Sequence, residues 1–473
     1  MRPSYLLAAA LLLPGCAHAA PPKPDFANLP AYLQALNRSA DPEAKAIRAR
    51  IASGPADLAR ERTLAEKAGL ATRPAQLVQP LPPPDQNAAP LYLQLDTLRK
   101  QKPLHFPPYA QSLKGHVAYT PAQIAAVQKE YDARPDIFSL LHQAADKPLC
   151  VFVYDPSKAF ELPPENAKMR ENARELTTES LLLAYQGKYS KAAVNQERGF
   201  KMAAHIAFGH KLFGYLTASG IDAITVDSLQ SILQKAGPNA ALDSRTSVDI
   251  LALPPLSLSH ALSGELATAD AEFDMLRKGN PNELGQVFPG DSPFSAPIPT
   301  STRLSVAEQT QLNALLDAAE ANSLHQMRSL IAVADGPNEA RQATLDKMKS
   351  SVEANRTDPI EALFGLISSV ASIDLSTQAN QVAARRLVAA AGASALAAKA
   401  QTGVFPASLP AQFTDPFTNK PLGYRLEGTN GFVVYSAGPG GTFDGGKPGD
   451  KRDSRQSVFR YPLVPRSAAS AGQ

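Results

Sequence analysis

The chain is poor in several residue types that mark common classes of function. Its 473 residues include no tryptophan, few aromatic residues and two cysteines. The scarcity of aromatic side chains disfavours a surface on which sugars or nucleobases stack. If Cys16 is cleaved off or lipidated, Cys150 has no partner, and an intramolecular disulfide is excluded. Cys150 stands in an apolar, β-branched run, residues 148–154, which predicts a buried and unreactive thiol.

A strong charge of one sign, a long apolar run and the common catalytic motifs are also missing. The formal net charge is +3 with both signs interspersed, so we expect no nucleic-acid partner. The alanine-rich run 383–400 carries Arg385, Arg386 and Lys399. No segment beyond the N-terminus reaches the ~18 uninterrupted apolar residues of a membrane span, so none is predicted in the mature chain. The Gly-x-Ser-x-Gly and His-Glu-x-x-His motifs are absent.

Residues 1–19 have the features of a secretory signal peptide. Arg2 precedes the short apolar segment 5–13, and residues 17–19, Ala-His-Ala, offer a cleavage site. A second interpretation uses residues 13–16, Leu-Pro-Gly-Cys, which resemble a bacterial lipobox in which Cys16 carries lipid and tethers the protein to a membrane. Pro14 is awkward in a lipobox, which slightly favours the cleaved form. Both interpretations predict export to the periplasm or outer envelope of a bacterium.

From residue 91 to about 372 the apolar pattern is mainly helical. In residues 174–208, two apolar faces at helical spacing flank Gly187, which suits the left-handed position that ends a helix. We therefore predict an antiparallel helical hairpin, one member of an irregular array or bundle, since a single hairpin cannot bury its own faces. Further elements are expected in this order: a long Pro/Gly/Ser loop at 279–303, then helices near 305–333, 336–352 and 358–371.

The predicted fold class is mainly α, with a small C-terminal α+β head that contains an antiparallel hairpin. Proline-rich residues 73–90 predict an extended linker after N-terminal helices that include 42–51 and 56–68. The predicted parts are the signal peptide 1–19, N-terminal helices and linker 20–90, a helical domain 91–372, a helix plus β head 373–464, and a disordered tail 465–473.

The C-terminal block has the most distinctive pattern. A long helix starts at Asp374-Leu375-Ser376 and ends before Gly403, and Asp415-Pro416-Phe417 follows. Strands 424–426 and 432–436 are joined through Asn430-Gly431, a strong hairpin signal. The hairpin ends in Tyr435-Ser436-Ala437-Gly438, and a glycine-rich loop, 440–446, follows. Over roughly residues 375–460 this order resembles the globular head of the major pseudopilin of bacterial type II secretion. The helical region before it resembles uncharacterised exported bacterial helical-repeat proteins.

The pseudopilin resemblance implies a calcium site in the loop after the last strand. In this chain Gly440 stands where an acid is often seen, and the candidate ligands are Asp444 and Asp450, with Asp453 less favoured. Calcium takes six to eight oxygen ligands, which scattered acids barely supply, so solvated turn acids are the alternative. The chain also departs from the family because a soluble helical domain precedes the head, where pseudopilins begin with an apolar membrane helix. We expect no other cofactor.

Few other residues suggest chemistry. His205 and His210 are five positions apart, so they do not lie on a common helix face. We therefore predict that they are packing or surface histidines. Glu265 and Glu272 would share a helix face, with Asp270 to one side, and a solvated face is preferred over paired-carboxylate catalysis. A charge cluster on an ordinary helix surface is predicted for Glu171, Arg174 and Glu175. Another polar group consists of Ser257, Ser259 and His260, which are close in sequence but lack a nucleophile elbow.

Two hypotheses about function follow. The first is a non-catalytic helical scaffold or interaction protein that presents a pseudopilin-like head to a protein partner in the envelope. The second is a periplasmic, hydrolase-like enzyme with its site between the helical domain and the 279–303 loop. A deep pocket lined by His205, Glu265 or similar groups with shifted pKa values would favour the enzyme. The missing motifs favour the scaffold. A helical lipoprotein that stabilises an assembly is a third hypothesis, which depends on Cys16.

Overall fold

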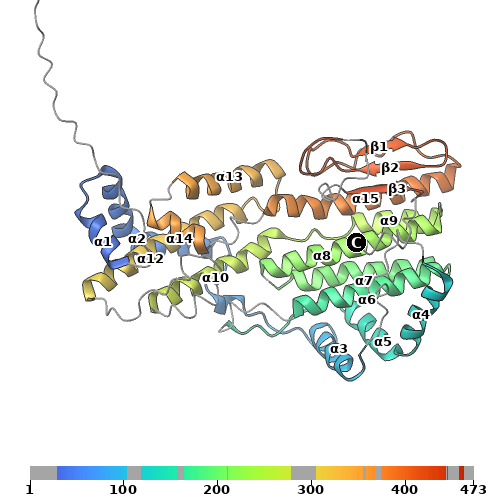
Figure 1. Cartoon of the computed structure of the whole chain (residues 1–473), viewed down its shortest axis with the longest axis horizontal. Coiled ribbons are helices and arrows are strands. Elements are labelled where there is room, and N and C mark those ends of the chain that lie inside the picture. The colour runs from blue at the N-terminus through green and yellow to red at the C-terminus, as the bar shows by residue number, and fades with distance from the viewer. Residues whose placement is uncertain are drawn as a thin grey trace, which may run out of the picture. The chain divides into compact units, whose positions relative to one another are not determined.

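The computed structural model is mainly helical, with a small antiparallel sheet of three strands near the C-terminus (Figure 1). This confirms the predicted fold class. Among the described residues, no helix combines the length and the apolar character needed to cross a membrane. The structure describes residues 29–103, 119–156, 165–209, 211–278, 305–354, 358–367, 374–443, 445 and 457–462.

The chain divides into two compact units, each assembled from separate stretches. The first unit takes its described residues from Met1–Leu64, Glu272–Leu324 and Lys349–Ser368. Its helices are α1 (Leu29–Arg38), α2 (Pro42–Lys67), α12 (Val306–Ile331) and α14 (Pro359–Ile367), with the end of α10 (Leu258–Lys278) and of α13 (Asn338–Ala354). The helices predicted near 305–333, 336–352 and 358–371 are therefore present.

Helix α2 shows where the sequence pattern was misleading. Helices 42–51 and 56–68 were expected to be separate, but α2 is continuous, with Pro55 inside it. A proline inside a helix costs about 3 kcal/mol because it removes one backbone hydrogen bond. Close packing offsets that cost: a Cβ added to Gly54 would lie 2.5 Å from the Ala314 carbonyl oxygen of α12. Arg62 also binds the buried Glu320 at 2.6 Å.

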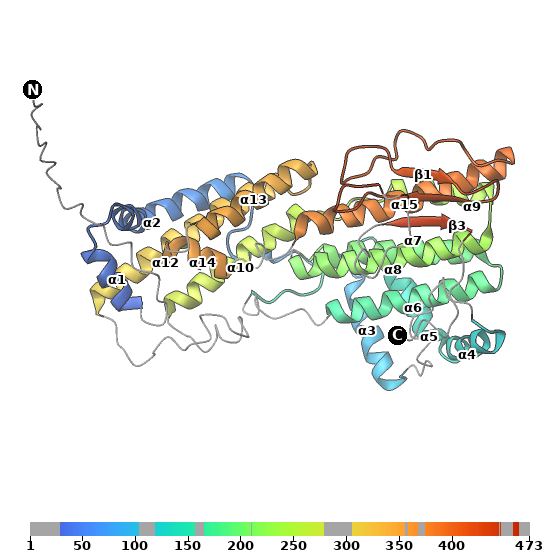
Figure 2. The same cartoon turned by 45° about the horizontal axis from the view of Figure 1, so that its top comes forward.

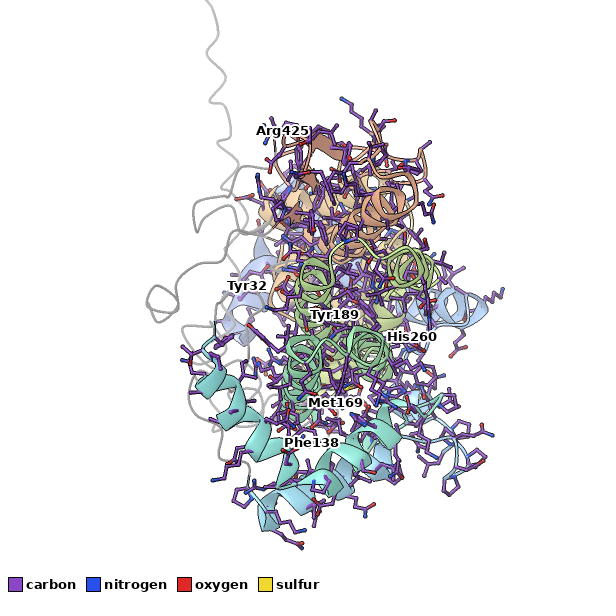
Figure 3. The ribbon with its side chains drawn as sticks, turned by 90° about the vertical axis from the view of Figure 1, so that its right-hand side faces the viewer. Tyr32, Phe138, Met169, Tyr189, His260 and Arg425 are labelled. Carbon is purple, nitrogen blue, oxygen red and sulfur yellow. The ribbon has the colours of Figure 1, made fainter. Side chains whose placement is uncertain are left out.

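The second unit takes its described residues from Ala65–Ala271, His325–Met348 and Ser369–Gln473. Figure 1 shows its helices in layers, with the sheet next to α15 and α9, followed by α8, α7 and α6. Figure 3 labels Phe138, Met169, Tyr189 and Arg425 at successive levels of this stack. The helices are α3 (Ala89–Gln101), α4 (Pro121–Asp132), α5 (Pro135–Ala145), α6 (Glu165–Tyr185), α7 (Tyr189–Ala207), α8 (Leu212–Ala236), α9 (Ala240–Leu251) and α15 (Leu375–Thr402), with the short 3-10 helix η1 (Pro74–Leu77).

The predicted helical hairpin is confirmed as α6 and α7. Gly187 has a φ of +74°, the left-handed conformation expected at the end of α6. The Lys188 N–H donates to the Leu183 carbonyl at 2.8 Å, which closes the turn. Helix α8 packs on both members of the pair, so the apolar faces that a lone hairpin would expose are buried.

The C-terminal elements also match the prediction at both ends of the long helix. The Asp374 side chain accepts a hydrogen bond from the Thr377 N–H at 3.1 Å and caps α15, and Gly403 ends it with a φ of +79°. The hairpin is formed by β1 (Gly423–Leu426) and β2 (Phe432–Tyr435). A third strand, β3 (Val458–Tyr461), was not predicted, and it pairs antiparallel with β2. Figure 2 shows the three strands side by side over α15.

The sheet shares a hydrophobic core with α7, α8, α9 and α15. Phe432, Val434 and Phe459 of the sheet join buried residues of α15 with Phe200 of α7 and Leu229 of α8. A second core lies among α3, α5, α6 and α7. The head is therefore anchored to the helical layers by continuous apolar packing, which fixes the surface that it presents.

Candidate functional site

The carboxylate of Asp415 is fully buried and connects two segments of the C-terminal head. It accepts the Phe417 N–H at 2.9 Å within its own turn, and the Ala437 N–H at 2.6 Å after strand β2. The Ser436 hydroxyl donates to the same carboxylate at 3.1 Å. One side chain thus joins the Asp-Pro-Phe turn to the residues from which the glycine-rich loop departs.

The sheet meets α15 at a glycine. A Cβ added to Gly392 would lie 2.6 Å from the ring of Phe459, which is completely buried. Gly423 plays a similar part in β1, where the ring of Tyr435 covers its backbone. These glycines are needed because aromatic rings occupy the space of a side chain.

The outer side of the hairpin carries charge. Arg425 binds Glu427 at 2.9 Å, and Arg460 of β3 forms an ion pair with the same carboxylate. Arg425 is exposed, as Figure 3 shows at the edge of the head. The connection between β1 and β2 is a five-residue loop in which the Glu427 N–H donates to the Gly431 carbonyl at 2.8 Å. Its left-handed residue is Gly428.

The residues predicted to bind calcium or lipid cannot be placed. Asp444, Asp450, Asp453 and Cys16 lie outside the described residues. Within the part of the chain that is described, no group of three or more histidine, cysteine, aspartate or glutamate side chains is arranged to hold a metal ion. The calcium site therefore stays a prediction from the resemblance.

A small cavity of about 80 Å³ lies elsewhere in the second unit. The beginnings of α6 and α8, the end of α7 and the segment Cys150–Tyr154 surround it. Glu165, His205 and Lys211 are its ionisable lining residues beside Cys150 and Tyr154. Burial raises the pKa of the Cys150 thiol to about 12, so the thiolate is disfavoured. The prediction that Cys150 is buried is confirmed.

His205 is a packing residue, as predicted. Its Nε2 lies 2.9 Å from the Lys147 carbonyl, which can only accept, so Nε2 carries the proton. Nδ1 then accepts from the Tyr92 hydroxyl at 3.1 Å. Burial lowers the pKa of His205 to about 4, against an ordinary value near 6.5. His210 lies outside the described residues.

Acidification is expected to destabilise the protein through His205. The unfolded chain takes up a proton below about pH 6.5 and the folded chain only below about 4, so stability is full above pH 6.5 and falls as the pH drops towards 4. Between pH 7 and pH 5 this amounts to about 2 kcal/mol. Urea unfolding at both pH values should show a drop larger by that amount in the wild type than in His205→Gln. All other residues are the same in the two proteins, so equal drops would contradict the assignment.

Glu171 is exposed as predicted, but several other acids expected on solvated surfaces are not exposed. Asp270 is buried, and Glu265 accepts the Leu212 N–H at 2.9 Å at the start of α8. Glu175 is buried in an ion pair with Arg99 of α3. Burial raises its pKa to about 7, although the Arg99 charge opposes the shift. The helical spacing of these acids gave no sign of burial, because the neighbouring helices come from distant parts of the chain.

Ser257, Ser259 and His260 form no catalytic constellation. Both serine hydroxyls donate to the Asp335 carboxylate, at 2.8 and 2.6 Å, and that carboxylate also accepts the Leu258 N–H at 2.7 Å. Asp335 therefore caps the beginning of α10, although it lies 77 positions after Leu258 in the chain. The His260 ring points instead at the Phe208 carbonyl, with Nε2 at 3.2 Å. The role of Asp335 was not predicted, since nothing local in the sequence connects it to α10.

Comparison with protein-family models, with curated proteins and with solved structures found no match.

Proposed function

We propose that this is an exported bacterial envelope protein whose helical layers present the C-terminal head to a protein partner. The Asp415 contact carries the proposal. It ties the Asp-Pro-Phe turn to Ser436 and Ala437, the motifs on which the pseudopilin resemblance rests. The common core of the sheet with α15, α7 and α8 supports it further, because a rigidly anchored head presents a preorganised surface.

Site-specific photo-crosslinking in the bacterial envelope tests the proposal. A photoreactive residue at Thr429, exposed at the tip of the β1–β2 loop, should give one discrete adduct with another envelope protein. The matched control places the same residue at Lys191, exposed on α7, where no such adduct is expected. Adding Asp415→Ala to the Thr429 variant should abolish the adduct. No adduct at Thr429, or the same adduct from both positions, would count against presentation by the head.

A hydrolase-like periplasmic enzyme is the second candidate. It is favoured by the cavity that His205 and Glu165 line, since the pKa of both residues is shifted by burial. The geometry supports it less well, because both ring nitrogens of His205 already hold partners. Residues 279–303, the loop assigned to the enzyme site, lie outside the described residues.

A further inference from the structure

A second cavity, of about 190 Å³, lies in the second unit among α8, α9 and α15, which Figure 1 shows in neighbouring layers. Two polar side chains line it, Tyr215 of α8 and Arg386 of α15. The rest of the wall is apolar and comes from one face of α15, from the end of α9 and from the connection to α10. It includes Val382, Ala383, Leu387, Ile250, Leu253 and Leu256. An occupant therefore meets an apolar wall and two groups that can form hydrogen bonds.

Tyr215 is 1% exposed, yet its hydroxyl makes no hydrogen bond within the described part of the chain. A buried tyrosine hydroxyl usually has a partner, because folding removes the water that was bound to it in the unfolded chain. Since Tyr215 lines the cavity, a molecule in the cavity can supply the partner. An oxygen atom of that molecule would accept the hydroxyl proton.

Arg386 is also buried, and only some of its N–H groups have acceptors. Nε donates to Oδ1 of Asp222 at 2.7 Å, Nη2 lies 2.5 Å from the same oxygen, and Nη1 donates to the Pro254 carbonyl at 2.8 Å. Each terminal nitrogen of a guanidinium carries two N–H groups, so the second N–H of Nη1 and of Nη2 has no acceptor among the described residues. The Phe200 ring packs on this guanidinium, with its centre 5.6 Å from Cζ, and holds it in place.

The charges around these two polar groups balance. Asp222 is completely buried and neutralises Arg386. The charged groups that act on the Tyr215 hydroxyl are two arginines and two aspartates: Arg341, Arg386, Asp222 and Asp335. A charged ligand would lose its hydration in this cavity without gaining a free counter-charge. A neutral ligand with one oxygen acceptor would instead complete the hydrogen bonds of Tyr215 and Arg386.

The volume limits the size of the ligand. An apolar cavity of about 150 Å³ binds benzene. A cavity of about 190 Å³ therefore has room for one six-membered ring with a short substituent.

The geometry points to a binding site for a small neutral molecule with a ring-sized apolar body and one carbonyl oxygen, with the oxygen at Tyr215 and Arg386 and the body against the apolar wall. Because helices and a connection line the site, it adds a function to the one proposed for the head. A ligand of about nine heavy atoms makes few contacts, so a Kd on the order of 1 mM is expected.

Ligand-observed NMR on the full-length protein with acetophenone as the probe tests this site. The wild type should bind acetophenone. α-Methylstyrene has the same shape with a CH₂ group in place of the carbonyl oxygen, and it should bind about fivefold more weakly because it accepts no hydrogen bond. Benzoate carries a charge and should bind about tenfold more weakly, because its carboxylate loses hydration in the cavity.

Two substitutions test the oxygen contact and the location separately. Tyr215→Phe removes only the hydroxyl, so it should weaken acetophenone binding about threefold and leave α-methylstyrene binding unchanged. Ala383→Leu fills part of the cavity and should weaken the binding of both molecules about tenfold. Ala400→Leu is the matched control, because it makes the same change at an exposed position of α15 that does not line the cavity. It should bind both molecules like wild type.

Circular dichroism would establish that each variant is folded, and Ala383→Leu still tests the location should Tyr215→Phe fail to fold. Acetophenone that does not bind the wild type overturns the assignment. So does α-methylstyrene or benzoate that binds as tightly as acetophenone. Tyr215→Phe or Ala383→Leu that binds acetophenone like wild type also overturns it.

Discussion

Replacing Asp415 with alanine is expected to lower the free energy of unfolding by about 4 kcal/mol, because hydrogen bonds to a charged group are worth roughly 1.5–3 kcal/mol each. The substitution leaves the Ala437 N–H and the Ser436 hydroxyl buried without their acceptor, and it removes the acceptor of the partly buried Phe417 N–H. Urea denaturation measures the loss. Limited proteolysis should show cleavage that begins within the head, at residues after 403.

Two variants sharpen this result. Asp415→Asn keeps one acceptor oxygen and should lose about half as much stability as Asp415→Ala. Thr429→Ala, at an exposed position of the hairpin loop, should leave the unfolding curve unchanged. One ordinary hydrogen bond contributes about 1 kcal/mol. A loss of unfolding free energy below that value for Asp415→Ala would show that the carboxylate does not hold the two segments of the head together.

Placing leucine at Gly392 is expected to separate the sheet from α15, at a cost of about 3–4 kcal/mol, the upper end of overpacking effects. The Phe459 ring already fills the space into which the new side chain must grow, with its nearest atom 2.6 Å from the position of a Cβ. The ring is fully buried between α15 and its own sheet, so it has little room to move. Thermal unfolding followed by circular dichroism measures the change.

A double-mutant cycle tests whether this single contact is responsible. Gly392→Ala alone should cost about 1–3 kcal/mol, and Phe459→Leu in the same chain should recover part of that loss, because the smaller side chain makes room. Ala400→Leu, at an exposed position of α15, serves as the control and should be nearly neutral. Additive effects of the two core substitutions would refute direct packing of Phe459 on Gly392.

Local chemistry accounts for the elements that sequence analysis placed well. Gly187 and Gly403 end helices because glycine adopts positive φ without steric cost, and Asp374 starts one because its carboxylate accepts a free N–H. These effects act within four residues, so they can be read from a short stretch of sequence. The hairpin at Asn430-Gly431 was also found in this way, although its left-handed residue is Gly428.

Strand β3 was missed for a different reason. Its alternating residues, Val458-Phe459-Arg460-Tyr461, are typical of a strand, and this pattern was the available signal. The strand begins more than twenty residues after the end of β2, a separation longer than that of a hairpin loop read from a local turn signal. Pairing at that separation depends on the closed tertiary structure, including the buried Phe459 ring on α15.

The candidate site was likewise predicted only in part. The Asp415 turn and the Ser436-Ala437 segment stood out as motifs, but their connection through one carboxylate was not predicted. The cavity could not be predicted at all, because Tyr154, Lys211 and the beginning of α6 come from three separate segments. Its lining residues carry no common motif, and each alone is an ordinary core or surface residue.

By itself the sequence determined the mainly helical class, the α6–α7 hairpin, the limits of α15 and the presence of a β hairpin, because periodicity, caps and turn residues act over a few positions. Tertiary structure alone decided that α2 continues through Pro55, that Glu175 is buried against Arg99, and that Asp335 caps α10. In each of these cases a partner far away in the chain supplies the compensating contact, and its free energy outweighs the local preference.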